Sequence, residues 1–189
     1  LMSTTRDFRT FSTPQPWFKS ADLPALVRDR GMIDTTVLQE GDHFYRFTKV
    51  TEAKGCPSPD IIGQRSPSLR AAGASGSWQV VSRCIGRTAG TPEVEGPSIF
   101  KANDGDTSGY KYYLWVDHYS GIGYIPLGTN ALEDDIKWTR IQDARLPPRP
   151  RHGSVLSITA EERDALVAKW GNSSDRPRKF QGGIGIADH

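Results

Sequence analysis

Three side chains able to act as acids, bases or ligands each stand near the start of a segment with strand-forming residues. They are Asp34, Glu95 and His152, which are 61 and 57 residues apart. Two carboxyl groups that converge on one pocket are the minimum equipment for cleaving a glycosidic bond. One of them must stay protonated near neutral pH, and burial or a neighbouring negative charge raises the pKa of a carboxyl group. Asp and Glu at strand starts also serve as turn or cap residues, so the spacing needs structural support.

That support comes from an internal repeat of about sixty residues. Residues 32–38 and 43–49 predict a hairpin around a turn at 39–42, and residues 93–100 and 110–117 predict a second hairpin. Residues 151–156 resemble the opening of a third unit. Each unit also ends in an aromatic residue and an outer-strand pattern, with Phe11, Trp78 and Trp138 spaced 67 and 60 residues apart. In this alignment Asp34 and Glu95 occupy the same position of the repeat.

Units of this length with three or four short strands predict an all-β fold built from β-propeller blades. In a propeller the innermost strand of each blade lines a central channel, so the three openings would direct Asp34, Glu95 and His152 towards one axis. The period is longer than in most blades, so we expect long loops at residues 53–65 and 87–91. An unrelated run of hairpins in a β-sandwich is the alternative.

One helix is predicted near the C-terminal end. Thr159 can cap its N-terminus, Glu162 completes a capping box, and Gly171 ends the run. We expect Leu166 and Trp170 to dock this helix on a sheet. Residues 172–189 have the composition of a linker or frayed terminus, so the expected domain covers residues 1–171.

Composition narrows the function classes. The 189 residues carry 24 Lys and Arg against 22 Asp and Glu, and a net charge of +2 does not indicate a nucleic-acid-binding protein. The sequence contains neither an apolar stretch long enough to span a membrane nor a signal-peptide pattern. Cys56 and Cys84 cannot form a zinc site alone; they are a disulfide of a secreted protein or two free thiols.

Four segments, taken in order, carry a resemblance to glycoside hydrolase family 43. Glu95-Gly96-Pro97, followed by the aromatic strand that ends at Asp117, resembles the general-acid blade of that family, and Met32-Ile33-Asp34 resembles the preceding blade. Thr5-Arg6-Asp7-Phe8 with Phe11 resembles a blade-closing segment, and the segment from Pro150 to Val155 is similar to the one that puts a histidine on the propeller axis. The resemblance covers roughly residues 3 to 170.

The resemblance implies a five-bladed propeller that hydrolyses arabinofuranosyl or xylosyl linkages of plant polysaccharide with inversion. It implies that Glu95 is the general acid and that Asp34 raises the pKa of this acid and orients it. The activity that the resemblance implies requires no cofactor. The resemblance also implies a structural calcium ion or a water cluster near His152. A buried structural histidine beside Arg151 is the alternative for His152.

One part of the family pattern has no counterpart in the sequence. An inverting hydrolase needs a carboxylate base, which this family takes from its first blade, whereas residues 1–189 begin within the equivalent of the second blade and cover about three blades. We therefore expect the base and the missing blades to come from a longer protein, from another chain or from self-association. The alternatives are a non-catalytic carbohydrate-binding fragment and an interaction scaffold.

Aromatic side chains offer platforms for sugar rings. Trp115 and Tyr119 are candidates to bind the substrate, an arabinose- or xylose-containing oligosaccharide or polysaccharide, and Asp117 can reach the same pocket. Packing between blades is the alternative role of Trp115. No nucleic-acid or membrane partner is expected, and a polysaccharide substrate predicts a secreted or extracellular protein.

Overall fold

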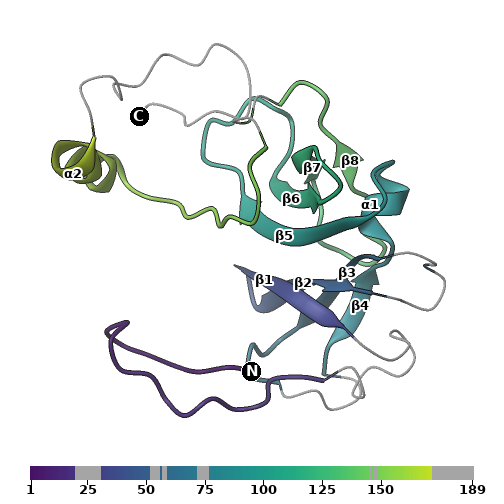
Figure 1. Ribbon diagram of the computed structural model, residues 1–189, viewed down its shortest axis with the longest axis horizontal. Coiled ribbons are helices and arrows are strands. Elements are labelled where there is room, and N and C mark those ends of the chain that lie inside the picture. Colours follow the sequence, from purple (N-terminus) through teal and green to yellow (C-terminus); the bar gives the residue numbers. More distant parts are fainter. Residues whose placement is uncertain are drawn as a thin grey trace.

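The computed structural model is built mostly from two four-stranded antiparallel sheets (Figure 1). It describes residues 1–19, 31–51, 56, 59–71, 77–144, 146 and 149–171. The first sheet contains β1 (Met32–Glu40), β2 (His43–Val50), β3 (Asp60–Ser66) and β4 (Gln79–Ser82). The second contains β5 (Val94–Lys101), β6 (Tyr112–His118), β7 (Gly123–Thr129) and β8 (Thr139–Arg140), and α1 (Ile85–Thr88) lies in the connection between the sheets.

Each sheet is a meander in which neighbouring strands follow one another along the chain. The two predicted hairpins correspond to β1–β2 and β5–β6 and are confirmed. Trp78 and Trp138 directly precede the outer strands β4 and β8, as the repeat predicts. Phe11 does not share that role, because it is 60% exposed in an N-terminal loop closed by a bridge between Met2 and Gln15.

The third predicted strand is wrong. Residues 151–158 form no strand, so the described part of the chain contains two sheets where the repeat predicts three. Alternation of side chains makes a segment suitable for a sheet, but a strand also requires a neighbour whose backbone groups complete its hydrogen bonds. We call residues 149–158 the strap, because they run across the second sheet towards α2 (Figure 1).

The repeat alignment is shifted by one residue. Ile33 lies opposite Lys49 in the first sheet and Glu95 lies opposite Asp117 in the second, and both strands contain a register shift directly afterwards. Glu95 therefore corresponds to Ile33, and Asp34 corresponds to Gly96. Both residues of the latter pair have positive φ angles, of 54° and 52°, and such a bulge accommodates Pro97, which has no backbone N–H to donate.

The main core lies between the two sheets. Alternate residues of β2 and β6 face it, including Phe47, Leu114 and Val116, all fully buried. The Phe47 ring packs edge-to-face on Trp138 with centroids 5.5 Å apart. Because β1 lies beside β5, the starts of these two strands come together at one end of the core.

Each sheet also has a face that points away from this core. Arg46 lies on that face of the first sheet, fully buried, with its guanidinium carbon 3.9 Å from the Phe18 ring centroid and 4.1 Å from that of Trp78. The corresponding face of the second sheet carries Glu95, Asp117, Trp115, Tyr113 and Phe100. We call it the outer face of the second sheet, and the strap crosses it.

The C-terminal helix forms where it is predicted but does not dock. The structure has α2 (Ala160–Trp170) with a complete capping box between Thr159 and Glu162. Leu166 is 51% and Trp170 73% exposed, because the helix stands at the end of the strap, away from both sheets (Figure 1). Residues 172–189, predicted to be a linker, lie outside the described residues.

No helix within the described ranges is long and apolar enough to cross a membrane.

Two further features resolve or correct the sequence expectations. Cys56 and Cys84 form a disulfide, which joins the segment before β3 to the start of α1. The predicted loop at 53–65 is wrong over residues 60–65, because β3 begins at Asp60. The carboxylate of Asp60 accepts hydrogen bonds from the backbone of Ile61, Gly86 and Arg87, and its burial raises its pKa.

Candidate active site

Two carboxylates face each other at the start of the second sheet. Glu95 on β5 and Asp117 on β6 are cross-strand partners, so their side chains emerge on the same face, the outer face. The Asp117 side chain is fully buried and that of Glu95 is 20% exposed. The bulge at Gly96-Pro97 ends the regular pairing directly after Glu95, and this sets the position of the acid at the end of the sheet.

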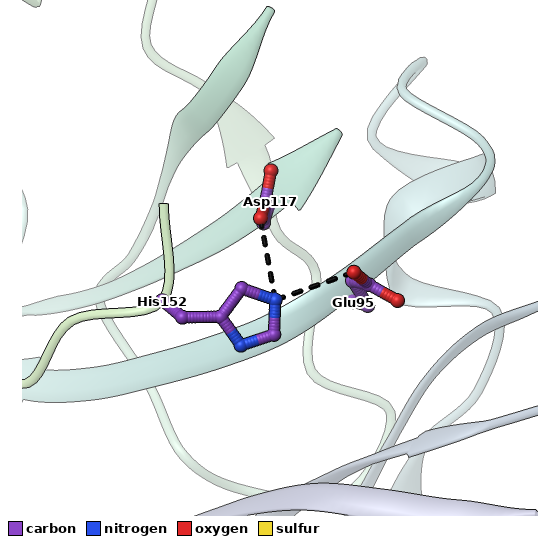
Figure 2. A group of neighbouring side chains, drawn as sticks. All are labelled: Glu95, Asp117 and His152. Carbon is purple, nitrogen blue, oxygen red and sulfur yellow. Dashed lines mark hydrogen bonds and ion pairs between the residues drawn. The ribbon is translucent and has the colours of Figure 1, made fainter. Parts of the chain in front are cut away.

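The strap brings two basic side chains to these carboxylates. Arg151 donates from Nε to Asp117 Oδ2 over 2.8 Å and from Nη2 to Glu95 Oε1 over 3.0 Å. The Nε2 atom of His152 lies 3.2 Å from Glu95 Oε1 and 3.4 Å from Asp117 Oδ2 (Figure 2). Both basic residues therefore contact the same two carboxylate oxygens.

The cluster contains further polar groups. Lys49 on β2 places Nζ 4.0 Å from Glu95 Oε2, so this acid has cations on both sides. The Oδ1 atom of Asp117 is buried and has no hydrogen-bond partner in the part of the chain that the structure describes. An acceptor of this kind is costly to bury and is available to a donor that a ligand would bring.

Asp34 reaches the site through the backbone. Its Oδ2 atom accepts a hydrogen bond from the backbone N–H of Gly96 over 3.2 Å. The neighbouring bond from the Ile99 N–H to Thr36 Oγ1 ties β5 to β1 in the same way. Asp34 thus contacts the residue that follows Glu95, and the structure brings both predicted acids to the same end of the core.

Tyr124 and Trp115 flank the carboxylates. The Tyr124 hydroxyl donates to the Gly153 carbonyl over 3.1 Å and accepts from the Gly153 N–H, which fastens the strap to β7. Burial raises the pKa of Tyr124; the Gly153 bond opposes this shift, and the charges of Asp117 and Asp34 add to it.

Trp115 packs on Phe100 and Tyr124, with ring centroids 5.2 and 5.8 Å away. Tyr119 follows β6 in a loop and is 36% exposed, and slight burial together with the charges of Glu93 and Glu95 raises its pKa.

A cavity of about 650 Å³ continues along the outer face from Trp115. Phe100, Tyr113 and Trp115 form its floor, Asp106 stands at its edge, and residues 154–160 form its cover. Because Asp117, Trp115 and Tyr113 alternate along β6, the carboxylate pair and the cavity lie on the same face of the sheet.

A calcium ion does not fit the cluster as the structure arranges it. Glu95, Asp117 and His152 each offer one ligand atom, and these atoms lie within 4.8 Å of one another. Calcium takes six to eight oxygen ligands, whereas this set consists of two carboxylate oxygens and one imidazole nitrogen. Both oxygens are already bonded to Arg151.

The structure gathers most of the predicted site residues and adds one. Asp34, Glu95, Asp117 and His152 meet at one end of the second sheet, Trp115 lies next to them, and Tyr119 lies in the loop beyond β6. Sequence reasoning missed Arg151, which makes the shortest ion pair of the cluster. The sequence signal that could have identified Arg151 is its position directly before His152, in the segment that carries the family resemblance.

One comparison with known proteins identifies a family that covers most of the chain. A family model described as a probable glycosyl hydrolase domain, related to glycosyl hydrolase family 43, matches residues 1–164. No curated protein and no solved structure matches the chain significantly.

Proposed function

The chain belongs to this family of probable glycosyl hydrolase domains related to family 43, and from that premise we propose that it cleaves arabinofuranosyl or xylosyl linkages of plant polysaccharide with inversion. The observation that carries the proposal is the pairing of Glu95 with Asp117, next to Asp34, at one end of the second sheet. Carboxyl groups gathered at a partly buried site are what hydrolysis of a glycosidic bond requires.

In this proposal Glu95 is the general acid that protonates the leaving oxygen. Its partial exposure supports the role, because an acid must touch both the protein and the substrate. Asp34 orients Glu95 through the hydrogen bond that it accepts from Gly96 N–H. Asp117 and His152 surround the same position and bind the substrate.

The carboxylate base comes from outside this chain. An inverting mechanism requires the base about 6.5–9.5 Å from the acid, on the opposite side of the bond, to leave room for water. A carboxylate oxygen of Asp117 lies within 4.8 Å of one of Glu95, and this separation is too short for the base. The two sheets are then consecutive blades of a five-bladed propeller whose remaining blades another chain segment or a second copy supplies. Their matching order and matching bulges support this arrangement.

The substrate binds along the outer face of the second sheet, with sugar rings stacked on Trp115 and Tyr119. An aromatic ring contacts the apolar face of a sugar, and the open cavity beside Trp115 supports this use of its ring. The protein works in an oxidising, extracellular compartment, which the Cys56–Cys84 disulfide supports.

The test is hydrolysis of an aryl arabinofuranoside and an aryl xyloside by the assembled enzyme, in which the chain segment or second copy that supplies the base is present, and by its Glu95→Gln variant. We expect the variant to lose about a hundredfold or more in kcat for a substrate whose leaving group needs protonation, since general acid catalysis contributes roughly 10²–10⁴-fold. NMR detection of the first-formed anomer checks inversion. Unchanged turnover by Glu95→Gln would exclude this role of Glu95.

A second candidate is a carbohydrate-binding module without catalysis. The observation in its favour is that Arg151 and His152 both form hydrogen bonds with Glu95 Oε1, the oxygen that a general acid would use to protonate the leaving group. Under this alternative the protein binds arabino- or xylo-oligosaccharides in calorimetry and releases no sugar, and Glu95→Gln changes neither result.

A further inference from the structure

We propose that Arg151 is the resident cation of this site: its guanidinium bridges Glu95 and Asp117 and positions Glu95, in the place where the family resemblance implies a metal ion. The positioning role rests on the proposed function, whereas the role as resident cation does not.

The bridge joins two strands and the strap through one rigid group. Nε bonds Asp117 on β6 at 2.8 Å and Nη2 bonds Glu95 on β5 at 3.0 Å. The guanidinium is planar, so two bonds from different nitrogens fix the direction of both carboxylates at once. A lysine ammonium in the same place is a point charge and lacks this fork geometry.

Arg151 and a metal ion would compete for the same atoms. The oxygens that could ligate an ion are Glu95 Oε1 and Asp117 Oδ2, and both accept hydrogen bonds from Arg151. His152 Nε2, the third ligand atom, is turned towards the same two oxygens (Figure 2). An ion can therefore bind only after the Arg151 side chain has moved away, which its 50% exposure allows.

The charge of Arg151 also suits a permanent role. A guanidinium remains protonated at every pH at which proteins work. Unlike a bound ion, this cation cannot be removed by a chelator or lost on dilution.

The first experiment measures thermal unfolding and turnover after dialysis against EDTA, and again after addition of CaCl₂ or ZnCl₂. We expect the wild-type protein to keep its melting temperature and its activity throughout, because a ligand that binds only the folded state would raise the melting temperature. A lower melting temperature after EDTA that CaCl₂ restores would overturn the proposal.

The second experiment removes the cation with Arg151→Met, which keeps most of the apolar stem. The control is Arg149→Met, two residues away on the same strap, for which no ion pair with the cluster is found. We expect Arg151→Met to lose about tenfold or more in kcat/KM and to gain saturable ZnCl₂ binding that raises its melting temperature. Arg149→Met should show neither change.

Two further measurements cover failure to fold and failure of the proposed function. Arg151→Lys keeps the positive charge but lacks the planar pair of N–H donors, so its activity should lie between those of the wild type and Arg151→Met. Guanidinium added to Arg151→Ala should restore part of the activity. If the assembled enzyme, with the source of the base present, hydrolyses no glycoside, the proposed function fails, while the metal titrations still decide whether Arg151 is the resident cation. Equal ZnCl₂ binding by wild type and Arg151→Met would refute it.

Discussion

The two sheets share one topology and one bulge, yet their matching faces have different surroundings. On the face of the first sheet that bears Phe47 and Lys49, the whole second sheet packs against the strands. On the matching face of the second sheet, the equivalent positions are Trp115 and Asp117, and only the strap crosses them. The first face became core, while the second retains a cavity and a charged cluster.

The comparison shows where this fold can place function. At the first position of the bulge the first sheet has Ile33 opposite Lys49, and the second has Glu95 opposite Asp117. Where the second sheet covers the first, water is excluded and apolar residues such as the fully buried Phe47 are favoured, while Ile33 at the end of the sheet stays 45% exposed. A strap leaves gaps, and carboxylates can remain there because Arg151 and His152 contact them.

The sharpest test of this difference is a matched pair of truncations. Phe47→Ala should lower the free energy of unfolding by about 3–5 kcal/mol, because it leaves a cavity between two packed sheets. Trp115→Ala should cost less, about 1–2 kcal/mol, because the outer face is already incompletely filled. Urea unfolding of both variants measures the two values. Equal losses would mean that the strap covers its face as completely as a sheet does.

A smaller effect comes from adding one methyl group to each region. In Gly63→Ala the new Cβ would lie 2.9 Å from Phe47 Cε1 and 3.3 Å from Ser82 Cβ, so overpacking should cost about 1–3 kcal/mol. In Gly153→Ala on the strap, the nearest Tyr124 atom is 3.7 Å away, an ordinary contact.

We expect Gly153→Ala to change the free energy of unfolding by less than about 0.5 kcal/mol, as surface substitutions do. Thermal unfolding compares the two glycine variants. A larger loss for the strap variant would reverse the comparison.

The smallest effect concerns Tyr113, which lies on the floor of the cavity. Its hydroxyl donates to Asp106 over 2.8 Å and also contacts Ser108. Burial, followed by the charge and hydrogen bond of Asp106, raises the pKa of Tyr113 to about 12. Because the folded pKa exceeds the unfolded value of about 10, the stabilisation is complete below pH 10 and is lost as pH rises from 10 towards 12.

Tyr113→Phe should therefore reduce the loss of stability between pH 10 and 12 and should cost only about 1 kcal/mol at neutral pH. Denaturant unfolding at several pH values measures both effects. An identical alkaline profile for the wild type and the variant would show that Tyr113 is not shielded by the outer face and its cavity.

Local patterns in the sequence determined much of the scaffold. Alternating apolar residues around a turn predicted at 39–42 specify the β1–β2 hairpin, and Thr159 with Glu162 specifies the start of α2. These features depend on residues close together in the chain, whose steric and hydrogen-bonding preferences act before any tertiary contact forms. The aromatic residues before β4 and β8, Trp78 and Trp138, are predictable from the repeat of about sixty residues.

Tertiary structure decided what these elements contact. The strand pairing shifted the equivalence of Asp34 and Glu95 by one residue, because Glu95 pairs with Asp117 as Ile33 pairs with Lys49, which leaves Asp34 equivalent to Gly96. The strand pattern at 151–156 remained a strap because it pairs with no strand among the described residues, and Leu166 and Trp170 are exposed, at 51% and 73%. The contact of Arg151 with Glu95 and Asp117 joins residues up to 56 positions apart, and only the folded arrangement of strap and sheet brings them within hydrogen-bonding distance.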